Sequence, residues 1–283
     1  MIYVSTGHFR NKTPEELKEI FLKNNIKNIE FSGGRYQKLI DQYLCGIKND
    51  FNVQIHNYFP VPKKPIVINL ASKNIIVIND SINLIKKSID LTQKLGRKFF
   101  SFHAGYLIDI TIKDFGKAKN FCKITSWSEG METFLKNVFL LSKYARKKNI
   151  EILIENNVLG KGNFKFFKNN PFLMADYQDI KYIMTNTPDN VNLLCDLGHL
   201  KVSSNSLKFD AKEAHIKSKK WIKAYHVSDN NGSEDTNSEI KSNSWFAKDL
   251  KKVSSYTLEV YTENFNIIRN QIEILKNIIN DSK

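Results

Sequence analysis

The feature that most constrains the fold is a series of short apolar runs that each end in a histidine or a carboxylate. The runs are VQIH ending at His56, FFSFH at His103, EILIE at Glu155, NLLCD at Asp196, IKAYH at His226 and YTLEV around Glu259. Such groups are costly to bury without a partner, so their recurrence at the ends of buried strands predicts one shared site. A closed barrel of parallel strands would bring them together, because all its strands point their carboxyl ends at one face.

Strand-like and helix-like runs alternate along the whole chain. We expect strands at residues 2–5, 28–31, 52–56, 99–103, 151–155, 192–196, 222–226 and 257–260. Helices are expected at 14–24 with Thr13 as cap, and at 36–47, 80–95, 131–148, 174–184, 211–219, 245–251 and 264–279. This alternation predicts an α/β protein with a (β/α)8 TIM barrel, as a single domain over residues 1–283. A doubly wound sheet would favour a GxGxxG turn after the first strand, and STGHFRNKT has none.

Three connections that follow strands are long, at residues 57–79, 104–130 and 156–172. On the catalytic face of a barrel, loops of this size usually shape the access of substrate.

The charge balance needs a separate argument, because 43 Lys and Arg against 29 Asp and Glu give a net charge of +14. A basic protein can attract nucleic acid or phosphate-bearing ligands. Here the excess is mostly lysine scattered over segments such as RKKN and KSKK, which favours a solvated lysine face. Nucleic acid is therefore not the expected partner.

Cysteine usage and hydropathy indicate a compartment. The 3 cysteines are far apart and form no CxxC pair, which suits a reducing environment. No apolar run approaches the roughly 18 to 20 residues of a membrane span, and the first residues show no signal-peptide pattern. We expect a cytoplasmic protein that does not bind a membrane; a homo-oligomer is compatible with the sequence.

Four of the strand-end residues make the candidate metal site: Glu155, Asp196, His226 and Glu259. Glu155 follows three aliphatic residues and should lie near the barrel axis, with an ordinary salt bridge as the alternative. Asp196 opens the sequence DLGH, in which Gly198 permits a tight turn and His199 can turn back over the site; the alternative is an Asp that caps the turn. Such a set suits one divalent ion, Mn²⁺, Mg²⁺, Co²⁺ or Zn²⁺.

The segments IENN, CDLGH, YHVSDNNG and LEVY, in this order at the last four expected strands, resemble the xylose isomerase-like TIM-barrel superfamily of sugar isomerases, epimerases and related enzymes. The likeness covers nearly the whole chain. It implies that the four residues of the candidate metal site bind one divalent metal and that Glu155 and Glu259 also exchange protons with the substrate. It further implies that His199 contacts a substrate hydroxyl or carbonyl, and we expect Asn157 of IENN to bind substrate.

Residues 56–72, HNYFPVPKKPIVINLAS, additionally resemble sugar-phosphate isomerase/epimerase-like proteins often found in surface-polysaccharide biosynthesis clusters. This likeness implies a small-molecule sugar or sugar phosphate as the partner.

A sister branch of the superfamily is the type IV AP endonucleases, which carry three zinc ions and hydrolyse DNA phosphodiesters. That resemblance would place further metal ligands at His56 and His103, so a second metal there is the alternative. The third metal of that branch requires an Asp-Arg-His group, where this chain has Asp235-Thr236-Asn237. A complete three-zinc cluster is therefore not expected.

Other residues have less specific expectations. His56 and His103 could equally contact the metal ligands or a substrate hydroxyl. Glu30 ends the second expected strand and is a candidate for substrate binding, with a salt bridge to Arg35 as the alternative. His215 lies in a lysine-rich helix and is expected at the surface.

Together with these residues, the resemblance implies a metal-dependent sugar or sugar-phosphate isomerase or epimerase, which would transfer protons through an enediolate. The alternatives are a phosphodiester hydrolase with a second metal at His56 and His103, and a non-catalytic sugar- or metal-binding barrel. The pair of candidate bases, Glu155 and Glu259, argues against the latter. A position of His56 and His103 several ångströms outside the four-residue set would favour the one-metal enzyme.

Overall fold

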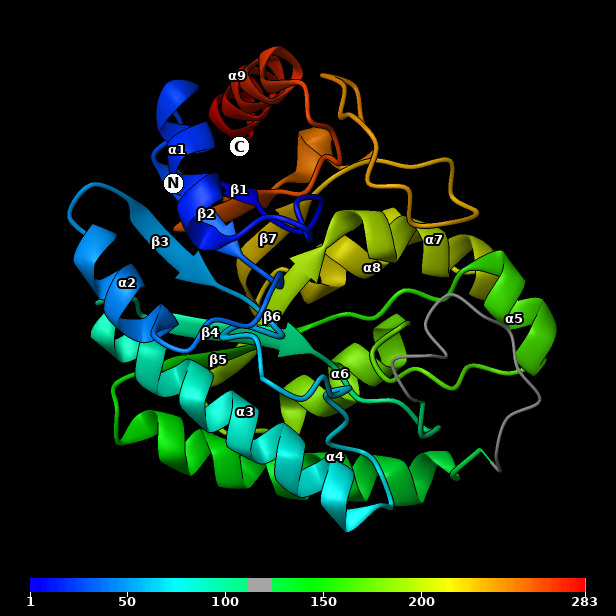
Figure 1. Ribbon diagram of the computed structural model, residues 1–283. Helices are drawn as coiled ribbons and strands as arrows, with labels where there is room; N and C mark the ends of the chain where they lie inside the picture. The colour runs from blue at the N-terminus through cyan, green and yellow to red at the C-terminus, as the bar shows by residue number, and fades with distance from the viewer. Residues whose placement is uncertain (111–123, 283) are drawn as a thin grey trace.

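Eight parallel strands form one sheet that curls into a nearly closed barrel in the computed structural model, which describes residues 1–110 and 124–282 (Figure 1). The strands are β1 (Ile2–Ser5), β2 (Asn28–Phe31), β3 (Asn52–Ile55), β4 (Phe99–His103), β5 (Glu151–Glu155), β6 (Val191–Asp196), β7 (Ile222–Val227) and β8 (Ser255–Leu258). Their order is β3-β2-β1-β8-β7-β6-β5-β4. The two ends of this order meet at a parallel bridge between His56 and Ser101. The predicted (β/α)8 TIM barrel is confirmed.

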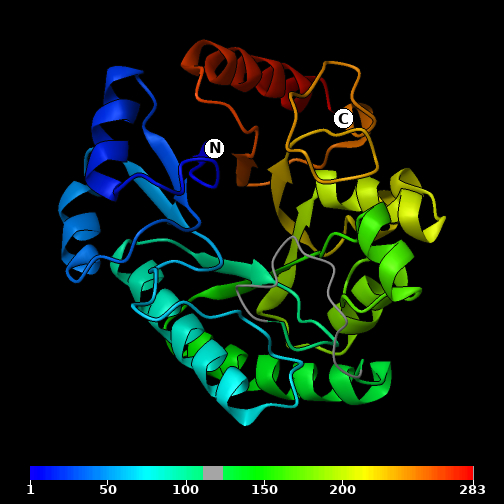
Figure 2. The same cartoon turned by 45° about the vertical axis from the view of Figure 1, so that its right-hand side comes forward.

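Helices surround the strands on the outside, as the two views in Figure 1 and Figure 2 show. They are α1 (Pro14–Lys23), α2 (Ile40–Ile47), α3 (Ile75–Lys94), α4 (Trp127–Arg146), α5 (Lys161–Phe167), α6 (Tyr177–Thr185), α7 (Leu197–Leu207), α8 (Ala211–Ser218) and α9 (Phe265–Asp281). The expected cap of the first helix is confirmed, since Thr13 and Glu16 form a reciprocal capping box around Pro14. None of the helices in the described residues is long and apolar enough to cross a membrane.

Several helix predictions were wrong in detail. The segment 245–251 forms only a 3-10 turn at Ala247–Asp249. Helices α5 and α7 were not predicted, because α5 buries no side chain and α7 is rich in serine and follows β6 without a connecting loop. Part of the long connection at 104–130 lies outside the described residues.

The strands present two faces, because successive side chains point in opposite directions. Ile152 and Ile154 of β5 belong to the large core between the strands and the helices. Leu153 lies instead with Leu194 and Ala224, from β6 and β7, in a separate small cluster. This cluster fills the interior of the barrel, and the next inward-facing residue of each of these strands lies at its carboxyl end.

His215 corrects a further expectation, because it is 0% exposed and does not lie on the surface. It is on the inward face of α8, where its Nε2 atom lies 2.8 Å from the hydroxyl of Tyr225. A lysine-rich helix can still bury one polar side chain when a hydrogen-bond partner is present.

Candidate metal centre

The residues that follow the interior cluster by two positions are Glu155, Asp196 and His226, at the ends of β5, β6 and β7. Glu259 joins them just after β8, where its backbone N–H donates to the carbonyl of Val227. All four side chains are buried, with 0% exposure for Glu155 and Asp196, 1% for His226 and 9% for Glu259. The barrel therefore brings the four predicted metal ligands to one place.

His226 lies at the centre of this group. Its Nδ1 atom is 3.1 Å from Glu155 Oε1, 3.5 Å from Glu259 Oε2 and 3.9 Å from Asp196 Oδ2. One ligand atom from each of the four residues lies within 4.8 Å of the others. That spread suits a single cation between them, because ligand atoms around a divalent ion lie about 2 Å from it.

Unpartnered atoms support the same fit. Both carboxylate oxygens of Glu155, Asp196 Oδ2 and His226 Nδ1 are buried without a hydrogen-bond partner in the described structure. Buried polar atoms are nearly always partnered, so such a concentration points to a ligand that these atoms share. Three carboxylates and one imidazole are appropriate donors for a divalent metal.

Burial and mutual charge shift the acidities of the carboxylates in opposite directions. Burial raises the pKa of Asp196 to about 8. Burial would also raise the pKa of Glu155, but His103 and His226 outweigh it and hold this pKa well below its usual value. Burial acts likewise on Glu259, where His226 prevails and lowers the pKa to about 2. The two glutamates are therefore ionised at neutral pH.

The imidazoles show the complementary effects. Burial lowers the pKa of His226, but Glu259, Glu30 and Glu155 outweigh burial and raise it well above its usual value. Burial dominates at His103 and lowers its pKa to about 4, although the nearby Glu155 acts in the opposite direction. Without a metal, the proton of His226 balances the negative charge of the surrounding carboxylates. A bound cation would balance the same charge.

His56 and His103 contact the candidate ligands and do not lie several ångströms away from them. His56 Nε2 is 3.1 Å and His103 Nδ1 3.3 Å from Glu155 Oε2. Two further groups could hold a metal, His56 with Glu155 and His226, and His103 with Glu155 and His199. The geometric condition that would have favoured the one-metal enzyme is therefore not met.

His199 turns back over the site as expected. Its Nδ1 atom lies 2.9 Å from the carbonyl oxygen of Asn156, and its Nε2 is 3.2 Å from Asp235 Oδ2. Asn237, in the position where the endonucleases carry a histidine, is buried with its Oδ1 unpartnered. It supplies no imidazole for a third metal.

Glu30 and Asn157 have surroundings that the sequence did not indicate. Glu30 is 0% exposed and its Oε1 lies 3.0 Å from Nε2 of His226; among the described residues it makes no ion pair with Arg35. The amide nitrogen of Asn157 donates to the carbonyl oxygens of Ala104, Gly105 and Leu173. These bonds connect the loop after β5 to the loop after β4 and to the segment before α6. Binding of substrate by either residue stays a prediction.

Ser5 was missed by the sequence reasoning. Its hydroxyl donates to Glu259 Oε1 over 2.8 Å, and its oxygen accepts the backbone N–H of Gly7. No pattern identifies one serine as a partner of Glu259, because the two residues meet only through the pairing of β1 with β8.

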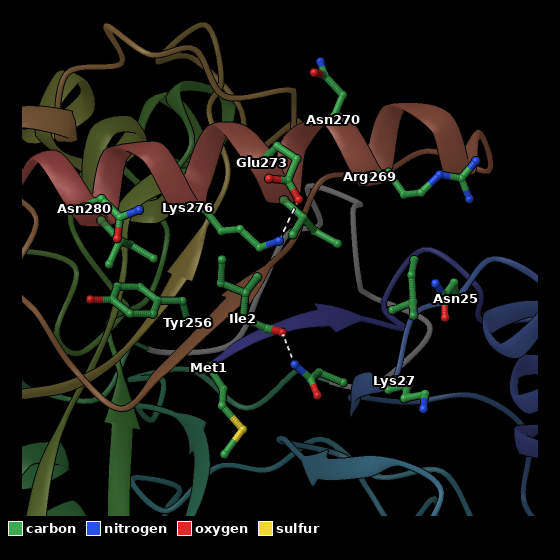
Figure 3. A pocket seen from close by; sticks show the side chains of 14 residues that line it. Met1, Ile2, Asn25, Lys27, Tyr256, Arg269, Asn270, Glu273, Lys276 and Asn280 are labelled. Carbon is green, nitrogen blue, oxygen red and sulfur yellow. Dashed lines mark hydrogen bonds and ion pairs between the residues drawn. The ribbon is translucent and has the colours of Figure 1, made fainter.

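A cavity of about 900 Å³ lies at the opposite end of the barrel, between α9 and the amino ends of β1, β2 and β8 (Figure 3). Its polar groups are largely engaged with one another: Lys276 pairs with Glu273, and the amide of Asn28 donates to the carbonyl of Ile2. None of the candidate ligands lines this cavity.

A model of the xylose isomerase-like TIM barrel family matches residues 12–252, and the chain belongs to this family. No curated protein matches the sequence.

Solved structures agree on the fold. A D-tagatose 3-epimerase-like protein is 18% identical with a TM-score of 0.72, over 99% of this chain and 98% of that one. D-psicose 3-epimerase with D-tagatose, from Clostridium cellulolyticum H10, is 11% identical with a TM-score of 0.66, over 98% and 99%. The IolI protein with a bound zinc atom is 12% identical with a TM-score of 0.67, over 100% and 99%. These matches span both chains almost completely.

Proposed function

We propose that this protein is a divalent-metal-dependent isomerase or epimerase of a sugar or sugar phosphate. The observation that carries the proposal is the convergence of Glu155, Asp196, His226 and Glu259 within 4.8 Å at the carboxyl ends of the strands. Enzymes on this fold keep their chemistry at that face. The names of two structural neighbours, a D-tagatose 3-epimerase-like protein and a D-psicose 3-epimerase, support a sugar as the substrate. A cytoplasmic location and a role in surface-polysaccharide metabolism stay predictions.

The metal would be held by Asp196, His226 and one oxygen from each glutamate. When bound, a divalent ion polarises a substrate carbonyl and stabilises the negative charge of an enediolate. The mixed nitrogen and oxygen donors accommodate Mn²⁺, Mg²⁺, Co²⁺ or Zn²⁺.

Proton transfer is the task of Glu155 and Glu259. Both are ionised at neutral pH for the reasons given above, so either can accept a proton from the carbon next to a carbonyl. Glu259 is the most exposed of the four candidate ligands, at 9%, and is therefore the one that we assign to the first proton transfer. The second carboxyl group returns a proton, to the opposite face of the same carbon in an epimerase or to the adjacent carbon in an isomerase.

Isotope exchange tests this function. Wild-type protein with saturating metal should wash deuterium from the solvent into a ketose or ketose phosphate at the carbon next to the carbonyl, as followed by NMR. Glu259→Gln keeps the size of the side chain but cannot accept a proton, so exchange should fall by roughly 10²- to 10⁴-fold while substrate still binds. The matched control is Glu263→Gln, the same change at an exposed position, which should exchange like the wild type. Undiminished exchange in Glu259→Gln would remove Glu259 from this role.

A metal-dependent phosphodiester hydrolase is the second candidate, favoured by the contact of His56 and His103 with Glu155 Oε2. In that enzyme the two histidines would hold a second metal. Because Asn237 supplies no imidazole and the lysine excess is scattered, we expect no efficient incision of abasic duplex DNA at physiological salt. Incision by the wild type that is lost in His103→Ala would promote the hydrolase.

A further inference from the structure

The interior of the barrel beneath the candidate metal site is polar on one side. On the β5, β6 and β7 side it is filled by the apolar cluster of Leu153, Leu194 and Ala224. On the opposite side, β2 contributes Glu30 and β3 contributes Gln54, and both side chains are buried. A carboxylate at 0% exposure is costly unless its oxygens are partnered.

One oxygen of Glu30 is held by its neighbours in the barrel. Its Oε2 atom accepts hydrogen bonds from the amide of Gln54 and, over 3.0 Å, from the hydroxyl of Thr257. Gln54 is in turn fixed by Ser255, whose hydroxyl donates to Gln54 Oε1 over 3.1 Å. These contacts join β2, β3 and β8. They orient the carboxylate of Glu30 and leave its Oε1 without a hydrogen bond.

Oε1 of Glu30 lies 3.0 Å from Nε2 of His226. The two atoms lie within ion-pair distance without forming a hydrogen bond in this structure, and neither has another hydrogen-bond partner among the described residues. The other nitrogen of this ring, Nδ1, faces the oxygens of Glu155 and Glu259 at 3.1 and 3.5 Å. The ring of His226 therefore lies between carboxylates on both sides. Nδ1 faces the candidate metal ligands Glu155 and Glu259, and Nε2 faces Glu30.

We propose that Glu30 is a positioning residue for the metal site: it accepts the proton of His226 Nε2 and so presents the Nδ1 lone pair to the cation. A histidine ligand must be neutral, and the hydrogen bond made by one ring nitrogen decides which nitrogen binds the metal. An ionised acceptor also makes the imidazole a stronger donor. This inference rests on the proposed metal site and assigns Glu30 a place behind that site instead of contact with the substrate.

The first test uses Zn²⁺ alone, with no substrate. Affinity is measured by competition with a chromophoric chelator for wild type, Glu30→Gln and the control Glu263→Gln. Glu30→Gln should bind Zn²⁺ about 10- to 100-fold more weakly, because its neutral oxygen is a poorer acceptor and its amide can turn a donor toward Nε2. Glu263→Gln makes the same change at an exposed position outside this network and should stay within about twofold of the wild type. Melting temperatures of both variants report whether they fold.

The second test measures the ring of His226 in the wild-type protein itself. Wild-type protein labelled with ¹⁵N-histidine should show, with Zn²⁺ bound, a His226 ring protonated at Nε2 and coordinated through Nδ1; the resonance is assigned by its loss in His226→Gln. A ring coordinated through Nε2 overturns the inference, as does unchanged Zn²⁺ affinity in a folded Glu30→Gln. A wild-type protein that binds no Zn²⁺ instead overturns the metal site itself, so the two failures are distinguishable.

Discussion

At the residue scale, Glu155 is the point at which the predicted site converges. Its Oε2 lies near His56 and His103, and its Oε1 lies 3.1 Å from His226 and 3.7 Å from His199. An ordinary salt bridge would engage one cation, usually a lysine or arginine at the surface. A fully buried carboxylate among four imidazoles fits the proposed role of a metal ligand, and its two oxygens could serve one metal or bridge two.

Ser5 offers a test at the same scale. Its hydroxyl holds one oxygen of Glu259 and leaves the other toward His226. A hydrogen bond to a charged group contributes about 1.5 to 3 kcal/mol, so Ser5→Ala should slow deuterium exchange roughly ten- to hundredfold while metal content stays unchanged.

The control for this change is Ser88→Ala. Ser88 is also buried and donates to the carbonyls of Phe59 and Leu84, far from the candidate ligands in the chain. It should lose stability without slowing exchange in the folded protein. Equal exchange rates in Ser5→Ala and the wild type would show that Ser5 does not position Glu259.

At the scale of elements, Asp196 joins β6 to α7 and answers a question that the sequence left open. Its Oδ1 accepts the backbone N–H of His199 over 2.7 Å and caps α7, whereas its Oδ2 is buried without a hydrogen bond. The cap and the metal ligand are therefore compatible, because each uses a different oxygen. The immediate start of α7 also carries His199 back over the site.

Helix α8 carries a testable effect of pH through His215. Burial lowers the pKa of this imidazole to about 4. Between pH 6.5 and 4, the imidazole is therefore protonated in the unfolded chain but neutral in the folded protein. Stability from this group is complete above pH 6.5 and falls as the pH drops, by up to about 3 kcal/mol. In denaturant titrations, the free energy of unfolding of His215→Phe should fall less than that of the wild type as the pH drops from 6.5 to 4.

Tyr225→Phe is the matched comparison. It removes the hydroxyl that lies 2.8 Å from His215 but leaves the imidazole buried. Its stability should be lower by about 1 kcal/mol at pH 7, with the wild-type dependence on pH retained. The same slope in His215→Phe as in the wild type would contradict the assignment.

At the scale of the whole molecule, the candidate metal site links four neighbouring strands of the barrel, β5 to β8, and so its occupancy should affect global stability. Without a cation, Glu155 and Glu259 repel each other in a buried environment. Metal at 100 times its dissociation constant should stabilise the fold by about 2.7 kcal/mol, which raises the melting temperature by roughly 5 °C; EDTA should reverse the gain. Calorimetry of Asp196→Ala should show a smaller gain. An unchanged melting temperature in the wild type on addition of Mn²⁺ or Zn²⁺ would argue against the site.

The sequence by itself determined the barrel and the face on which the ligands lie. Alternating strands and helices are local patterns, and a polar group at the end of an apolar run can be identified without knowledge of its neighbours. The candidate ligands Glu155, Asp196 and His226 were predictable for this reason, since parallel strands in a barrel necessarily bring their carboxyl ends together.

Only the tertiary structure decided what each of these groups touches. Ser5 meets Glu259 across 254 positions of sequence, and Glu30 meets His226 from the opposite side of the barrel. Such contacts depend on register and on which face of a strand points inward, and a shift of one residue would turn the side chain to the helices. The burial of His215 likewise follows from the packing of α8 against the barrel, because a lysine-rich sequence does not show which side of its helix faces inward.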